Sequence, residues 1–321
     1  MIRIRPFLAN NRPIVLAYAV TAALLGIIFL LRPGFASLTS LTALFQESAL
    51  LGLICMGQTL VVLSGGLDLS VPSVLAASGI ILTGLTLGLD SNLVWAVPVV
   101  LLGAAVIGVI NGLGVAYFEI QPLVMTLAMN TILFGAIAGI VAGGLRISGQ
   151  GHYSPPLMQF LIRGTPGGVP MSFLLLLGAA ILLTLFLSFS GLGRRIYLVG
   201  TNRTVSRYSG INVRFVLLAV YTLAGVLNGI AGMLLVGKTG FAFVGIGEGY
   251  LFPSVVAVLL GGAAIGGGVG HYIGTIAGAI ILTLLTYTLP VFNIPRGAQF
   301  ILYALVVLIA VRLGKSEQAV E

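Results

Sequence analysis

Runs of mostly apolar residues, many of them close to twenty residues long, follow one another along nearly the whole chain. A helix needs roughly 20 apolar residues to cross the hydrocarbon core of a bilayer. Charged residues supply only 7% of the chain, whereas a soluble domain carries about 25%. The sequence therefore excludes an ordinary soluble globule and predicts an all-α polytopic membrane protein.

Ten such runs are bounded by charge, proline or glycine, so we expect about ten transmembrane helices. The runs are 13–31, 41–64, 71–87, 92–118, 121–143, 171–189, 213–236, 251–265, 270–289 and 297–311. Glycines at 261–270 interrupt the later part of this pattern. A tilted span or a re-entrant loop is an alternative there, and totals of nine or eleven spans stay open.

Lysine and arginine predict the orientation, because cationic loops resist translocation. With the N-terminus inside, ten of these cations fall on the cytoplasmic side and five on the other. The inner set is Arg3, Arg5, Arg12, Arg194, Arg195, Arg203, Arg207, Arg214, Arg312 and Lys315, and the outer set is Arg32, Arg146, Arg163, Lys238 and Arg296. We therefore expect a cytoplasmic segment 1–12, a single transmembrane domain 13–313 whose first helix is not cleaved, and a cytoplasmic tail 314–321. The net charge of +8 is then a topology signal, and no nucleic-acid partner is expected.

Disulfide and metal chemistry are not expected. Cys55 is the single cysteine, so no disulfide can form within the chain. His152 and His271 are far apart in sequence and have no neighbouring carboxylate motif, which argues against a metal site.

Residues 190–214, which we call the cationic connector, form the one long polar segment on the expected cytoplasmic side and include five arginines. We expect Gly191 and Gly193 to end the sixth span. Thr201 or Asn202 is then expected to cap one short helix, and Gly210 is expected to end it. The connector is either a docking element for a partner or an ordinary cationic loop that obeys the positive-inside rule.

Residues 232–239 match the phosphate-loop pattern GxxxxGK[ST]. Such a loop cradles phosphates between a strand and a helix, whereas these residues close an apolar run. We expect no nucleotide site in this chain and interpret Lys238 as a cation at the end of a span.

The segment 57–78 interrupts the apolar pattern after the second run. Gly65 and Gly66 end that run, and Asp68 is the only charged residue of the segment. Ser70 is placed to cap the next helix, and Pro72 lies in the first turn of that helix, where a missing N–H costs nothing. A helix broken within a membrane must direct its free backbone groups at protein or water, and transporters use such breaks along the substrate path. Asp68 accordingly has two interpretations. In the structural one, its carboxylate caps the following helix or faces the cytoplasm; in the functional one, it lines a gate.

Four amides lie inside the apolar runs: Gln58, Asn111, Asn130 and Asn228. Each is expected to hydrogen-bond a neighbouring helix, or else to face a central path and touch a polyhydroxylated solute. Asn130 is the best placed for the second role, because Thr126 and Thr131 lie close to it. GxxxG spacings at 108–112, 135–143, 225–229 and 274–278 predict close helix contacts.

Three segments carry a resemblance to a known family. They are 57–71 (GQTLVVLSGGLDLSV), 193–213 (GRRIYLVGTNRTVSRYSGINV) and 255–281 (VVAVLLGGAAIGGGVGHYIGTIAGAII). From about residue 14 to residue 313 the chain resembles the transmembrane permease subunits of bacterial ABC importers for sugars of the ribose type, which are multi-pass proteins of the inner membrane.

The resemblance implies partners and a division of labour. Two permease subunits, the same or paralogous, would sit in lipid on two ABC ATPase subunits and receive sugar from an extracytoplasmic binding protein. ATP and Mg would be bound by the ATPase, so this chain would hold no cofactor and catalyse no reaction. The expected solute is a small neutral sugar, either a pentose, a hexose or a related polyol, which agrees with the near absence of charge inside the spans.

The resemblance also assigns candidate residues. It implies that the cationic connector contacts a groove of the ATPase through Gly193, Arg194, Arg195, Gly200, Asn202, Arg203, Arg207, Gly210, Ile211 and Asn212. The candidates for the translocation path or its gate are Gln58, Gly65, Gly66, Asp68, Ser70 and Asn130.

Two departures from the family pattern leave alternatives open. Pro72 stands where the family usually has glycine, and Phe252-Pro253 lies in a stretch that usually holds an acidic residue. The chain could thus be one half of a heterodimeric pair. A branched-chain amino-acid-type ABC permease is a further alternative, and so is an ion-coupled secondary transporter that uses Asp68. For the latter, Glu47, Glu119 and Glu248 offer little, because they lie near the ends of spans and are expected to be interfacial. An intramembrane enzyme is disfavoured, since the sequence offers no paired acids and no Ser/His arrangement at depth.

Overall fold

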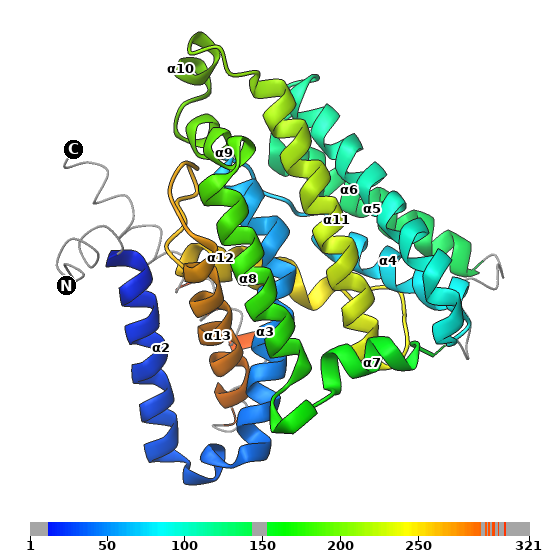
Figure 1. Cartoon of the computed structure of the whole chain (residues 1–321), viewed down its shortest axis with the longest axis vertical. Helices are drawn as coiled ribbons and strands as arrows, with labels where there is room; N and C mark the ends of the chain where they lie inside the picture. Colours follow the sequence, from blue (N-terminus) through cyan, green and yellow to red (C-terminus); the bar gives the residue numbers. More distant parts are fainter. Residues whose placement is uncertain are drawn as a thin grey trace.

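The structure is a computed structural model that describes residues 12–142 and 153–289, together with a few single positions between 293 and 305. Within these residues the chain is helical, and its only extended contact is an isolated bridge between Tyr153 and Phe241. The long helices pack as a bundle, and short helices and turns form its two ends (Figure 1). The all-α fold expected from the sequence is confirmed.

The helices follow the apolar runs closely. In chain order they are α2 Arg12–Leu31, η1 Pro33–Ala36, α3 Leu38–Leu63, α4 Val71–Thr86, η2 Asp90–Asn92, α5 Leu93–Ala116, α6 Pro122–Ala142, α7 Pro156–Arg163, η3 Pro166–Gly168, α8 Met171–Phe189, α9 Gly191–Thr201, α10 Arg203–Tyr208, α11 Val213–Thr239, η4 Glu248–Tyr250, α12 Leu251–Leu260 and α13 Tyr272–Thr288.

Six of the described helices, namely α2, α3, α5, α6, α8 and α11, are long and apolar enough to cross a membrane. Each coincides with an expected run. α3 begins at Leu38 and not at residue 41, because the side chain of Ser37 accepts a hydrogen bond from the Ser40 N–H and caps the helix.

Three expected spans are shorter than a bilayer is thick. α4 has 16 residues, α12 has 10 and α13 has 17, and a helix rises about 1.5 Å per residue. Residues 251–265 do not form one continuous helix, because Gly261 and Gly262 turn the chain after Leu260, with Gly262 at φ 88°; the expected interruption by glycines in this region is present. The tenth run lies outside the described residues apart from single positions, as do residues 1–11 and the tail 314–321.

Glycines bring α5 and α11 into backbone contact. A Cβ added at Gly108 would lie 2.5 Å from the Tyr221 carbonyl oxygen, and one added at Gly225 would lie 3.0 Å from the Gly108 Cα. The spacings 108–112, 225–229 and 274–278 thus mark helix contacts, as expected. The glycines at 135 and 139 do not, since a Cβ at either position meets no described atom within 4 Å.

The two ends of the bundle differ. α9 and α10 form one end, and α7 lies across the other (Figure 1). The sequence did not predict α7, because eight residues are too few to give an apolar run; it packs through the buried side chains of Met158 and Ile162.

Candidate functional site

The break between α3 and α4 is a tight glycine turn. Gly65 has φ 78°, a conformation that favours glycine. The N–H of Gly66 donates to the Val61 carbonyl at 3.0 Å and that of Gly65 donates to the Val62 carbonyl at 2.9 Å. These two bonds close the end of α3 as a Schellman motif. The predicted break is therefore present, at the predicted glycines.

Asp68 and Ser70 form a local pair inside the break. Asp68 is only 3% exposed, so it does not face the cytoplasm. Its Oδ1 accepts hydrogen bonds from the Ser70 N–H at 2.9 Å and from the Ser70 hydroxyl at 2.6 Å. The prediction that the Ser70 side chain caps α4 is wrong: Ser70 occupies the N-cap position, but its hydroxyl donates to Asp68 instead. Pro72 lies in the first turn of α4, as expected.

Amides from two other helices extend this pair into a buried polar network. Asn111 of α5 donates to the Ser70 hydroxyl at 2.9 Å, and Asn228 of α11 lies 3.4 Å from Asp68 Oδ2 through its Nδ2. The Asn111 and Asn228 Oδ1 atoms, both amide atoms of Gln58, and the Tyr221 hydroxyl are buried and have no hydrogen-bond partner among the described residues. Buried polar atoms of this kind are uncommon in folded proteins. The network thus concentrates unused hydrogen-bonding capacity beside the break.

Helix α6 satisfies the backbone groups that the break leaves free. The Thr126 hydroxyl accepts from the Leu69 N–H at 2.9 Å, and Asn130 Oδ1 accepts from the Ser73 N–H at 3.2 Å. Thr126 and Asn130 are four residues apart and therefore share one face of α6. Protein groups take the place of water at this break, as a broken helix in a membrane requires.

The cationic connector contains two helices where one was expected. Gly191 and Gly193 do not end the sixth span but belong to α9, because the Ser190 hydroxyl accepts from the Gly193 N–H at 2.8 Å and starts a new helix. Asn202 then caps α10 by accepting from the Val205 N–H at 3.0 Å, as predicted.

Glycine and asparagine end the connector. Gly210 has φ 79° and follows α10, and its N–H donates to the Arg207 carbonyl at 3.1 Å. Ile211, which is half-buried, donates to the Ser206 carbonyl at 3.0 Å. Asn212 caps α11 by accepting from the Phe215 N–H at 3.0 Å. Gly210 therefore stops α10 as predicted, and Ile211 packs against the hydrophobic core of the bundle.

The inner face of the connector touches the break through backbone atoms. Gly200 is buried in α9, and a Cβ there would collide with the backbone of Leu63 and Gly268. A Cβ at Gly267 would lie 2.6 Å from the Gly65 nitrogen, and the Gly268 N–H donates to the Leu63 carbonyl at 2.9 Å. Three segments far apart in sequence thus meet at glycines: the break, α9 and the turn between α12 and α13.

Two side chains strengthen this meeting point. Arg203 is half-buried and its Nη2 lies 3.4 Å from the Gly65 carbonyl oxygen. The Tyr197 hydroxyl of α9 donates to the Gly270 carbonyl at 3.0 Å. Burial raises the pKa of the Tyr197 hydroxyl, so this group stays neutral near pH 7. The connector is therefore fixed to the membrane-embedded part by direct contacts.

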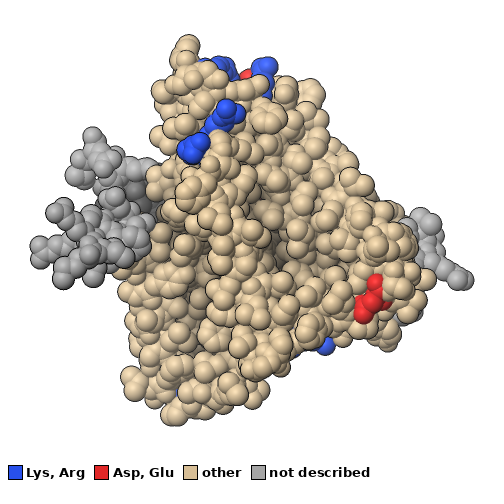
Figure 2. Space-filling view, viewed as in Figure 1, with Lys and Arg blue, Asp and Glu red and all other residues tan. Residues whose placement is uncertain are grey.

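The outer face of the connector is exposed and cationic. Arg194, Arg195 and Arg207 are exposed there, and Lys and Arg side chains gather over this end of the molecule (Figure 2). Val205 and Tyr208 are also exposed on α10, at 59% and 88%. This face combines apolar and cationic groups that a partner with acidic and apolar surface would complement.

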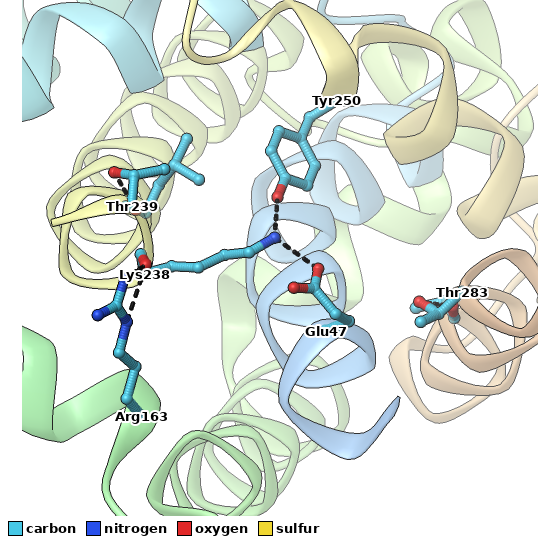
Figure 3. A network of polar contacts seen from close by, with 8 residues as sticks. Glu47, Arg163, Lys238, Thr239, Tyr250 and Thr283 are labelled. Atoms are coloured by element: carbon cyan, nitrogen blue, oxygen red, sulfur yellow. Dashed lines mark hydrogen bonds and ion pairs between the residues drawn. The ribbon is translucent and has the colours of Figure 1, made fainter. Parts of the chain in front are cut away.

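The opposite end of α11 holds a second polar network (Figure 3). Lys238 Nζ lies 2.6 Å from Glu47 Oε2 and 3.3 Å from the Tyr250 hydroxyl. Arg163 of α7 donates to the Lys238 carbonyl. The phosphate-loop pattern at 232–239 lies wholly within α11, so it forms no phosphate-binding loop, as predicted.

A small hollow opens where α4, α6 and the segment before α12 meet. It is lined by Pro72, Ser73, Ala76, Asn130, Phe134, Ile137, Val244, Gly245 and Glu248. A Cβ at Gly247 would collide with the Pro72 carbonyl, so this segment lies directly against the start of α4. The sequence predicted Asn130 as a residue of the translocation path, but it did not predict Phe134 or Glu248 in this role. The missed signal is the glycine spacing around residues 245–249, which allows the chain to approach another backbone.

The three segments that suggested a family all contribute to the point where the break, α9 and the turn between α12 and α13 meet, and the comparisons with known proteins agree with that suggestion. Residues 40–311 match the family described as "Branched-chain amino acid transport system / permease component". The chain belongs to this permease family. It is a multi-pass membrane protein and a transport subunit, and the match covers the break, the cationic connector and the glycine turn.

Several individual permeases are similar to this one. The chain is 33% identical to the ribose import permease protein RbsC of Escherichia coli strain K12, covering 92% of this chain and 91% of that protein. It is 34% identical to the autoinducer 2 import system permease protein LsrD of Photorhabdus laumondii, and the alignment covers 83% of this chain and 80% of that protein. It is 28% identical to the galactose/methyl galactoside import permease protein MglC of Haemophilus influenzae, covering 94% of each. No solved structure matches this permease.

Proposed function

We propose that this permease forms the transmembrane path of an ATP-driven importer for a small neutral sugar in the bacterial inner membrane. The observation that carries the proposal is the 33% identity to RbsC over 92% of the chain. MglC, a permease for galactose and methyl galactoside, resembles the chain over a similar share. Both relatives import neutral polyhydroxylated solutes, which need no charged partner inside a bilayer.

The amino-acid and ion-coupled alternatives have less support. The family description mentions branched-chain amino acids, but the relatives that match over most of the chain import ribose, galactose or autoinducer 2. An ion-coupled transporter would need Asp68 to exchange an ion with solvent, whereas Asp68 is buried and held by Ser70.

The proposed topology has about ten spans with both termini in the cytoplasm. It comprises a segment 1–12, a single permease domain 13–313 and a tail 314–321, with the cationic connector on the cytoplasmic side. The six long helices and the exposed arginines at one end of the bundle support this arrangement, because cationic segments stay in the cytoplasm.

The cationic connector is the proposed coupling element. Its exposed residues Arg194, Arg195 and Arg207 would contact the ATPase, while Gly193, Gly200 and Arg203 face the permease itself. Movement of the ATPase would displace α9 and α10, and the glycine contacts would carry that displacement to the break and to Asp68. The hinges of broken helices then open the path alternately to each side.

The proposed partners follow from this assignment. They are two ATPase subunits, which bind ATP and Mg, a second permease subunit, an extracytoplasmic sugar-binding protein and the surrounding lipid. Pro72 and Phe252-Pro253 differ from the usual family pattern, so the second subunit is either a copy of this chain or a paralogue that keeps the usual residues. The permease itself would carry no catalytic activity.

Uptake into proteoliposomes tests the proposed function. The permease, purified from native membranes with the proteins that accompany it, is reconstituted with ATP inside or outside and supplied with labelled ribose, galactose or leucine and the binding protein. We expect ATP-dependent accumulation of a sugar and none of leucine. Accumulation of leucine alone, or sugar uptake that follows an ion gradient without ATP, would overturn the proposal.

A further inference from the structure

The loop between α5 and α6, residues 117–121, lies at the same end of the bundle as the cationic connector, to which an ion pair joins it. We propose that this loop is a second docking element for the ABC ATPase, with the Phe118 side chain as its apolar contact. This inference rests on the proposed function and deepens it, because the family resemblance assigned the ATPase contact to the connector alone.

The backbone of the loop is held in an unusual turn. Glu119 has φ 55°, in the left-handed region that few residues other than glycine adopt. On either side of it, the Phe118 N–H donates to the Leu113 carbonyl at 3.2 Å and the Ile120 N–H donates to the Gly114 carbonyl at 3.0 Å. Such conformations persist where the surrounding structure imposes them. The turn leaves the Phe118 side chain 75% exposed.

Arg214, the last residue of the cationic connector, fastens this turn to the connector. Its Nη2 lies 3.7 Å from Glu119 Oε1, and its guanidinium carbon lies over the Tyr117 ring, 5.6 Å from the ring centroid. Arg214 stands in the first turn of α11, where the helix dipole disfavours a cation. The Glu119 carboxylate offsets that cost. The loop and the connector therefore form one continuous surface.

The position of the ion pair argues that a protein covers Phe118, and not lipid tails. The side chains of Arg214 and Glu119 are 53% and 70% exposed, and charged groups are costly inside hydrocarbon. Phe118, next to Glu119 in the chain, accordingly lies at or beyond the lipid headgroups. Large aromatic side chains are frequent anchors of protein interfaces.

Charge supports the ATPase as the occupant. The exposed Arg194, Arg195 and Arg207 of the connector form no ion pair with any acid in the described part of the chain. A partner with acidic groups around an apolar recess complements these arginines together with Phe118. The ATPase is the partner proposed for this side of the membrane, so one protein would cover both parts of the surface.

The loop also has its own connection to the break. α6 begins at Pro122, directly after the loop. Its Thr126 and Asn130 side chains accept hydrogen bonds from the backbone of the break and of the first turn of α4. Displacement of the loop by the ATPase would move these two acceptors. The movement would reach the break without passing through Gly200.

Thiol accessibility tests the docking element. Cys55 is the only cysteine and is buried, so a water-soluble maleimide reports on an introduced thiol. Phe118→Cys is compared with Tyr153→Cys, an exposed position beside Gly240 at the opposite end of α11. In lipid nanodiscs, we expect Phe118→Cys to react several-fold more slowly in the complex with the ATPase than after the ATPase has been stripped with a chaotropic salt. Tyr153→Cys should react equally in both.

Two results of this labelling would overturn the inference. Equal, rapid reaction of Phe118→Cys in both preparations would show that the ATPase does not cover the loop. Absence of reaction in both, with normal reaction of Tyr153→Cys, would show that lipid covers it.

Binding measurements separate the failure of this inference from failure of the proposed function. Phe118→Ala is expected to raise the dissociation constant of the stripped ATPase for the permease about tenfold, the loss of one interface anchor, at an unchanged melting temperature. Phe118→Leu keeps an apolar contact and should bind nearly as well as the unaltered chain. Unchanged binding by Phe118→Ala overturns the docking element alone. A permease that never binds an ATPase overturns the proposed function.

Discussion

The guanidinium group of Arg203 reaches from α10 to the carbonyl oxygen of Gly65, at a distance of 3.4 Å, and so joins the cationic connector to the break between α3 and α4. Arg207 lies on the same short helix and is exposed. Two arginines that the sequence placed in one group therefore have different surroundings, and they should have different roles.

Charge reversal should separate these roles. Arg207→Glu is expected to weaken the association of the ATPase without lowering the melting temperature, since surface substitutions usually change stability by less than about 0.5 kcal/mol. Arg203→Glu is expected to leave the ATPase bound but to uncouple ATP hydrolysis from uptake, because it loses the contact with Gly65. Pull-down and hydrolysis assays on both variants check this. Identical behaviour of the two would contradict the division.

Gly200 should tolerate no side chain. A Cβ at this position would collide with Leu63 and Gly268, and overpacking of a tight contact costs typically about 1–3 kcal/mol. Gly200→Ala is therefore expected to lower the thermal stability of the detergent-solubilised permease. Gly191→Ala serves as its control on the same helix, because a Cβ at Gly191 meets nothing within 4 Å. Equal melting temperatures for the two variants would argue against the glycine contact.

Asp68 should matter through its acceptor oxygens. Asp68→Ala would leave the Ser70 N–H and the Asn228 amide without their acceptor, and each buried unsatisfied group costs about 1–3 kcal/mol. Asp68→Asn keeps one acceptor oxygen and should be less destabilised. Thermal unfolding of the two variants measures the difference. If Asp68→Ala were as stable as the unaltered chain, the buried network would have no structural role.

The contact between Lys238 and Glu47 predicts that substitutions of these two residues have non-additive effects on stability. Removing one partner of a partly buried ion pair leaves the other charge uncompensated, so Lys238→Met and Glu47→Gln should each lower stability. The double variant should lose less stability than the sum of the losses in the two single variants. A double-mutant cycle by thermal unfolding provides the coupling energy, and additive effects would show that the 2.6 Å contact contributes nothing.

The sequence predicted the long helices well because their apolar runs are set by local composition. It also located the break, since Gly65 and Gly66 fix a turn whatever lies around them. It could not predict that Ser70 donates to Asp68 instead of capping α4, because that choice depends on Asn111 of a different helix.

The same limit applies to the candidate site. Gly200 and Arg203 were assigned to the surface that meets the ATPase, yet they face the break, because the fold brings Gly267 and Gly65 against α9. Glu248 was expected only near the end of a span, and the close approach of Gly247 to Pro72 also places it beside the start of α4. Contacts between distant segments decided these positions, and no single run of residues encodes them.

Co-purification from native membranes tests the central claim most directly. The permease is extracted in mild detergent, and the proteins that accompany the unaltered chain and the Arg207→Glu variant are compared. We predict that an ABC ATPase subunit accompanies the unaltered chain and is depleted from the variant while the permease stays folded. A well-folded permease that is never accompanied by an ATPase would contradict its assignment to an ATP-driven importer.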